Sequence, residues 1–80
     1  MNIVFTGPAT VNGERVVRSL LEEIARENGH YVQPSVDRST HCVVASSADF
    51  MSRKGKKLRD ADEYGVTVIS PDTFLEKYTH

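Results

Sequence analysis

The chain has 80 residues, which is enough for one small domain but not for a catalytic domain joined to a recognition domain. Ten lysines and arginines nearly balance eleven aspartates and glutamates, so net charge alone selects neither a nucleic-acid nor a membrane partner. The single cysteine, Cys42, excludes an internal disulfide, and no apolar stretch approaches the roughly 20 residues of a membrane span.

The first predicted strand covers residues 2–6, where Ile3–Phe5 is a continuous apolar run. Such a run indicates burial on both faces, as in the middle of a parallel sheet. A turn-rich segment follows, and we expect a helix from Asn12-Gly13 to about Asn28, with Asn12 as its cap. Helical spacing predicts an inward stripe on this helix, made of Val16, Val17, Leu20, Leu21, Ile24 and Ala25.

The second half of the chain alternates short apolar runs with helix patterns. We predict strands at His30–Gln33, Cys42–Ala45 and Val66–Ile69, a helix at Lys57–Tyr64, and a last helix that starts at Ser70-Pro71. The order strand, helix, strand, strand, helix, strand, helix predicts an α/β fold, with a four-stranded parallel sheet flanked by three helices. Ligands of such sheets bind at the carboxyl ends of strands, where Thr6 and Gly7 stand.

A basic segment enters the second predicted helix at this same end of the sheet. Five of the ten basic residues lie in it: Arg53, Lys54, Lys56, Lys57 and Arg59. Taken alone, the cluster is a solvated face, and Thr6 and Gly7 serve strand-end and turn geometry. Beside a phosphate site, the same cluster would follow a nucleic-acid backbone, with binding that falls steeply as salt is added.

These segments together resemble a BRCT domain over nearly the whole chain. The resemblance lies in Phe5-Thr6-Gly7, Asn28–Val32, Ser39–Val44 and Phe74. The spacing of Lys57, Ala61, Gly65 and the strand that ends at Ile69-Ser70 is similar to that in the BRCT domains of bacterial NAD-dependent DNA ligases and clamp-loader large subunits. Lys56 stands where the family often has serine, and tryptophan is absent, which favours the ligase and clamp-loader side over phosphopeptide-binding members.

The resemblance implies a phosphate site built from distant parts of the chain. Thr6 would give a hydroxyl, Gly7 a backbone N–H, and Lys57 a charge-assisted hydrogen bond. Arg15, expected in the first turn of the first helix, would be a fourth contact, although it lies one residue further from Thr6-Gly7 than the clamp-loader spacing. Lys54 and Lys56 would lie nearby, and we expect Lys57→Ala to weaken binding more than Lys54→Ala.

We therefore interpret residues 1–80 as a single non-catalytic BRCT-like module of DNA replication or repair. It would bind a phosphate, with 5′-phosphorylated DNA ends favoured. The alternative is a docking module for a phosphopeptide or an unmodified partner protein. A minimal α/β enzyme or signalling receiver is disfavoured, because clustered acidic residues at the strand ends are missing.

The same interpretation implies neither a cofactor nor a metal ion. His41 and Cys42 are adjacent, so on a strand their side chains point to opposite faces and make a poor metal pair.

We expect a monomer in isolation, without a membrane partner. With no basic-then-apolar leader, the expected location is the cytoplasm with its nucleoid, or the nucleus. A whole protein and a C-terminal domain of a ligase both remain open.

Overall fold

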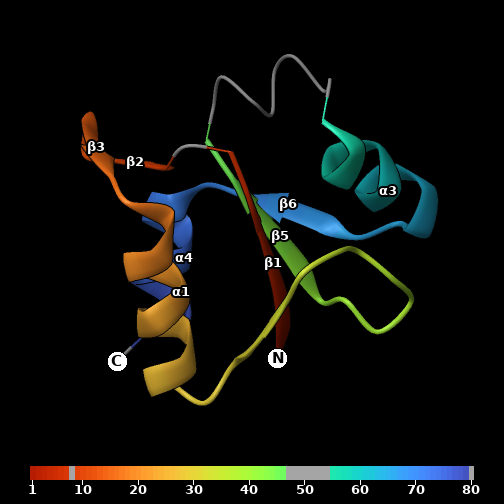
Figure 1. Cartoon of the computed structure of the whole chain (residues 1–80), viewed down its shortest axis with the longest axis horizontal. Helices are drawn as coiled ribbons and strands as arrows, with labels where there is room; N and C mark the ends of the chain where they lie inside the picture. The colour runs from red at the N-terminus through yellow and green to blue at the C-terminus, as the bar shows by residue number, and fades with distance from the viewer. Residues whose placement is uncertain (8, 47–54, 80) are drawn as a thin grey trace.

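The computed structural model describes residues 1–7, 9–46 and 55–79. Its centre is a four-stranded parallel sheet in the order β4-β1-β5-β6, as Figure 1 shows. The strands of this sheet are β1 (Asn2–Thr6), β4 (Tyr31–Gln33), β5 (Cys42–Ala45) and β6 (Thr67–Ile69). The helices are α1 (Arg18–Glu27), α3 (Lys56–Tyr64) and α4 (Pro71–Lys77). The predicted four-stranded parallel sheet with flanking helices is therefore confirmed.

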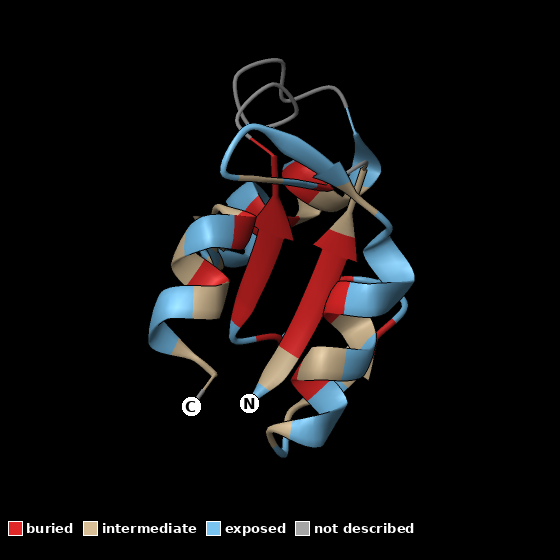
Figure 2. Ribbon diagram, turned by 90° about the vertical axis from the view of Figure 1, so that its left-hand side faces the viewer, coloured by how far each residue is buried: buried red, intermediate tan, exposed pale blue. Residues whose placement is uncertain are grey.

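The sheet has a hydrophobic core on each face, because successive strand residues point to opposite sides. One cluster packs beneath α1 and α4: Ile3, Phe5, Ala9, Leu21, Ala25, Cys42, Val44 and Phe74. The other packs beneath α3: Val4, Val36, Val43, Ala45, Leu58 and Ala61. Figure 2 shows the buried residues gathered on the strands and on the helix faces turned toward them. The central place of β1 explains its unbroken apolar run.

The segment after β1 differs from the predicted helix, because it forms a β-hairpin first. Strand β2 (Ala9–Val11) pairs antiparallel with β3 (Glu14–Val16). Asn12 and Gly13 form the two-residue turn with φ angles of 52° and 80°. Turns with positive φ at both central residues match the twist of a hairpin, and Asn-Gly is the dipeptide that favours them. Asn12 is thus a turn residue and not a helix cap.

Helix α1 begins only at Arg18, so the predicted inward stripe is partly wrong. Leu21 and Ala25 are buried as expected, and Ile24 packs against the same core. Val17 is the residue before the helix and is 70% exposed, and Leu20 is 50% exposed. The residues that were expected to form the first helical turn form the hairpin instead. The helix therefore starts later, and different side chains face the sheet.

The boundaries of the later helices agree with the sequence. Gly65 ends α3 in the left-handed conformation, with φ of 69°. Ser70 caps α4 by accepting a hydrogen bond from the Thr73 N–H, and Pro71 occupies the first helical position. These signals are local, which is why they predict the ends of the helices well.

Candidate functional site

The carboxyl end of β1 is open on the side of β4. The β1–β4 register ends at the pair Val4 and Gln33, whereas β1 continues to Thr6 beside β5. The Lys57 ammonium donates a hydrogen bond from α3 to the Phe5 carbonyl, at 2.9 Å from Nζ to the oxygen. A lysine 52 residues further along the chain is therefore fixed at the end of the first strand.

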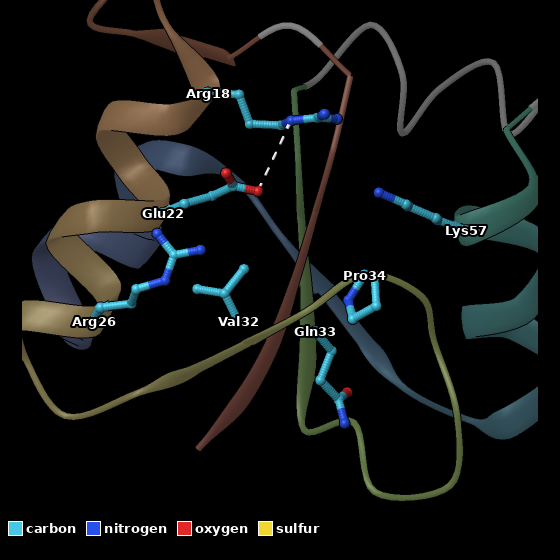
Figure 3. Close-up of a pocket in the computed structure, with 7 residues that line it drawn as sticks. All are labelled: Arg18, Glu22, Arg26, Val32, Gln33, Pro34 and Lys57. Carbon is cyan, nitrogen blue, oxygen red and sulfur yellow. Dashed lines mark ion pairs between the residues drawn. The ribbon is translucent and has the colours of Figure 1, made fainter.

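Arg18 reaches the same place from the other face of the sheet. A pocket of about 330 Å³ lies between α1, the end of β4 and α3; it is lined by Arg18, Glu22, Arg26, Val32, Gln33, Pro34 and Lys57. Figure 3 shows the Arg18 guanidinium and the Lys57 ammonium extending toward each other across β1. The two cations come from the first turns of two different helices.

The pocket carries an excess of positive charge. Three cationic side chains line it, against the single carboxylate of Glu22. Arg18 and Glu22 approach to 4.0 Å between Nε and Oε2, on successive turns of α1. Partial burial, and secondly the nearby Arg18, lower the pKa of Lys57, while Glu22 acts in the opposite direction. An anion in the pocket would relieve the repulsion between the two cations.

The helix ends at this site lack their usual capping groups. Neither the residue before α1, Val17, nor the residue before α3, Gly55, makes a side-chain capping bond, and neither first turn contains an acidic residue. By contrast, α4 has both a serine cap and Asp72 in its first turn. The first N–H groups of a helix have no partner within the helix, and they lie at the positive end of the helix dipole. Both features add to the attraction of Arg18 and Lys57 for an anion.

One of the residues that line the pocket, Gln33, belongs to a polar network with Ser39 and Thr40. The Gln33 side-chain amide donates to Ser39 Oγ at 2.8 Å and accepts from the Thr40 hydroxyl at 2.5 Å. Both polar ends of the amide are thereby occupied. Gln33 therefore has a structural role, because its two hydrogen bonds tie the end of β4 to the loop that follows it.

The structure brings some of the predicted site residues together and separates others. Lys57 binds the residue next to Thr6, and Gly7 follows with a left-handed φ of 70°. Neither Thr6 nor Gly7 is among the residues that line the pocket, although both directly follow Phe5, whose carbonyl accepts the Lys57 hydrogen bond. Arg15 lies on β3 as an exposed side chain, and not in the first turn of α1 as expected. Arg18 occupies that helical position instead.

The remaining predicted cations differ from Lys57. Lys56 points to the outside of α3, where it forms an ion pair with Asp60 at 2.8 Å and is 78% exposed. That carboxylate raises the pKa of Lys56. Lys54 lies outside the described residues. Arg18 is absent from the predicted site because the helix was expected to start earlier; its signal is the spacing of Arg18, Glu22 and Arg26 at four-residue intervals, which puts all three on one helix face.

The part of the chain that the structure describes contains neither a candidate metal site nor a candidate membrane-spanning helix. Within residues 1–7, 9–46 and 55–79, no three His, Cys, Asp or Glu side chains gather in a way that would hold a metal ion. His41 has a structural role, because its Nδ1 accepts the Asn2 backbone N–H at 2.8 Å. None of the helices in these ranges is long and apolar enough to cross a membrane.

Comparison with known proteins agrees with this fold. The family model of the BRCA1 C Terminus (BRCT) domain matches residues 2–76. The chain is 36% identical over 78 residues to a DNA ligase of Symbiobacterium thermophilum, and 40% identical over 74 residues to a DNA ligase of Chlorobium phaeobacteroides. These matches cover 98% and 92% of the chain, but only 10% of each ligase.

A more distant match is a protein named DNA ligase 2 in Streptomyces coelicolor, at 32% identity over 74 residues, or 92% of the chain and 10% of that protein. No solved structure gives a significant match. BRCT domains are non-catalytic modules, commonly found in DNA replication and repair proteins. The match over residues 2–76, together with the parallel sheet and its three helices, shows that the chain belongs to the BRCT domain family.

Proposed function

We propose that this BRCT domain binds the terminal phosphate of 5′-phosphorylated DNA. The observation that carries the proposal is the meeting of Arg18 and Lys57 at the open end of β1. Two cations of different geometry, with two uncapped helix N-termini beside them, suit a group that has several acceptor oxygens. Thr6 and Gly7, which follow the Lys57-bonded Phe5, would add a hydroxyl and a backbone N–H.

The charge of the pocket favours a terminal phosphate over an internal one. A phosphate monoester carries close to two negative charges at neutral pH, whereas a phosphodiester carries one. Burial and, secondly, the nearby Arg18 lower the pKa of Lys57, and a dianion between these two cations gains more than a monoanion does.

The relatives favour DNA as the carrier of this phosphate, because the proteins that match are named DNA ligases. The chain spans about a tenth of their length, so its role is that of an accessory module beside other domains. In that role we expect it to act on DNA in the cytoplasmic nucleoid or the nucleus. The alternative ligand is a phosphoserine or phosphothreonine peptide, which offers the same dianion.

One titration separates these ligands. The isotopically labelled chain is titrated with a 5′-phosphorylated duplex, with the same duplex lacking the phosphate, and with a phosphoserine peptide. We expect amide shifts at Thr6, Gly7 and Lys57 with the first ligand, and much weaker shifts with the other two. Equal response to both duplexes would show general backbone attraction, and a response to the peptide alone would make this a phosphopeptide module.

A matched pair of lysine variants locates the site on the protein. Lys57→Ala removes a cation that lines the pocket, whereas Lys56→Ala removes a neighbouring cation that is engaged with Asp60 on the outside of α3. The expected loss of affinity for the 5′-phosphorylated duplex is roughly tenfold or more for Lys57→Ala and less than about twofold for Lys56→Ala, in line with the strength of buried and exposed charge pairs. Equal losses would mean that no defined pocket exists.

A further inference from the structure

The β2–β3 hairpin gives the domain a second element at the end of the sheet where β1 ends. Figure 1 shows it above the first turn of α1, at the same end of the molecule as the start of α3. The hairpin is anchored to the body: the Asn12 backbone N–H donates to Asp72 Oδ1 at 3.0 Å. Ala9 is buried, and Val11 and Val16 pack against the core beneath α1 and α4. It is a fixed projection with its own exposed face.

That exposed face carries a cation and a hydroxyl side by side. Thr10 and Arg15 are directly paired across the two strands, and both are exposed. Side chains in such a pair have Cβ atoms about 4.5–5.5 Å apart. Glu14 is the neighbour of Arg15, but alternate strand residues point to opposite faces, so its carboxylate does not lie beside the guanidinium. Among the described residues, Arg15 forms no ion pair.

Arg15 lies within a short reach of the proposed phosphate pocket. It precedes Arg18 by three positions in the sequence, so their Cα atoms are at most about 11 Å apart even if the chain is fully extended. One DNA strand rises about 3.4 Å per nucleotide, so this span corresponds to roughly three nucleotides. A strand whose end sits in the pocket, and which leaves it on the side of the hairpin, would bring further phosphates within reach of Arg15.

We propose that Arg15, supported by Thr10, binds an internal backbone phosphate of the DNA strand whose terminal phosphate lies in the Arg18–Lys57 pocket. This inference rests on the proposed function and gives the hairpin a separate role. The pocket recognises the end of the strand, and the hairpin recognises that a polynucleotide follows it. A phosphopeptide carries one phosphate and no repeating charge, so it would gain little from this second anchor.

The test compares ligands with one phosphate and with many. The ligands are a nucleoside 5′-monophosphate and a 5′-phosphorylated duplex, and the variants are Arg15→Gln, Arg18→Gln and, as the matched control, Arg38→Gln. Arg38 is also exposed but lies next to Ser39, which binds Asn2 at the opposite end of β1. Thermal unfolding of each variant checks that the fold is kept.

We expect Arg15→Gln to weaken duplex binding severalfold and to reduce the slope of log affinity against log salt by about 0.9, the value of one phosphate contact. Its affinity for the mononucleotide should stay unchanged, whereas Arg18→Gln should lose affinity for both ligands and Arg38→Gln for neither.

Two results would overturn the inference without touching the proposed function. In the first, Arg15→Gln behaves like Arg38→Gln on the duplex while Arg18→Gln loses binding. In the second, Arg15→Gln weakens the mononucleotide as much as the duplex, which would make Arg15 part of the pocket. If the original chain does not distinguish duplexes with and without the 5′ phosphate, the proposed function itself fails, and the hairpin inference falls with it.

Discussion

At the scale of single residues, Glu22 is the carboxylate that an incoming phosphate would meet. It lines the pocket with Arg18, Arg26 and Lys57, and its Oε2 lies 4.0 Å from Arg18 Nε. Both partners are partly solvent-exposed, with side-chain exposures of 47% for Arg18 and 25% for Glu22, so the pair is a weak one. A phosphate would compete with Glu22 for Arg18, and the Glu22 carboxylate would repel the phosphate.

Removing this carboxylate should strengthen the binding of a phosphate. We predict that Glu22→Gln tightens the binding of the 5′-phosphorylated duplex by roughly tenfold, from Coulomb's law for a unit charge about 6 Å from a dianion at an effective dielectric constant of about 80. The measurement is a fluorescence anisotropy titration at constant salt. Glu23→Gln is the control for net charge, because Glu23 is the next residue on α1 and is exposed. Weaker binding by Glu22→Gln would mean that the carboxylate serves mainly to position Arg18.

At the scale of elements, the parallel sheet was predictable and the hairpin was not. The two central strands, β1 and β5, contain unbroken apolar runs such as Ile3–Phe5, and burial on both faces leaves that pattern in the sequence. The hairpin strands, Ala9–Val11 and Glu14–Val16, are short and interrupted by polar residues, so neither contains an apolar run that would mark it as a strand. Asn12-Gly13 fits a turn as well as a helix start, and only the packing of Val11 and Val16 on the core decides between them.

The error in this one element also explains the error in the site. Lys57 is predictable because its spacing to Ala61 and Gly65 lies within one helix and the following turn. The arginine that joins it depends on where α1 begins, and the hairpin moves that start to Arg18. Arg18 and Lys57 line one pocket from helices on opposite faces of the sheet, and this arrangement is tertiary, so no local pattern in the sequence encodes it.

The hairpin turn makes a prediction about stability. Gly13 has a φ of 80° and no atom within 4 Å of the place where a Cβ would stand, so an added methyl group would meet no clash with its surroundings. The cost of Gly13→Ala should therefore be the left-handed backbone alone, about 1 kcal/mol in the free energy of unfolding. Gly13→Asn is the matched control, since asparagine adopts this conformation more readily, and it should recover most of the loss. Urea denaturation measures both, and equal losses would contradict the assigned turn.

At the scale of the whole molecule, the site depends on both cores at once. Arg18 is carried by a helix on one face of the sheet and Lys57 by a helix on the other. A domain of this size has a total stability of only about 4–12 kcal/mol. Phe74, fully buried and in edge-to-face contact with Phe5 at 5.3 Å between ring centroids, supports one core, and Leu58 supports the other. The geometry of the pocket is thus a property of the complete fold.

The buried thiol of Cys42 makes the free energy of unfolding depend on pH. Cys42 begins β5 within the core beneath α1 and α4, and 3% of its surface is exposed. Burial raises the pKa of its thiol to about 11. In the unfolded chain the thiol has an ordinary pKa of about 9 and loses its proton first as pH rises. Between these two values the unfolded state binds fewer protons than the folded state, so the free energy of unfolding must fall with increasing pH.

We therefore predict that this thiol contributes a loss of stability on the order of 1 kcal/mol between about pH 8 and pH 10, since each pKa unit corresponds to about 1.4 kcal/mol. Lysines and tyrosines also titrate in this range, so the thiol is isolated by comparison with Cys42→Ala. That variant is less stable at the lower pH because it leaves a small cavity, but its stability should decline less steeply as the pH rises. Urea denaturation at several pH values measures both slopes. Parallel slopes would show that the folded thiol ionises as easily as the unfolded one, and that β5 opens to solvent well before the domain unfolds.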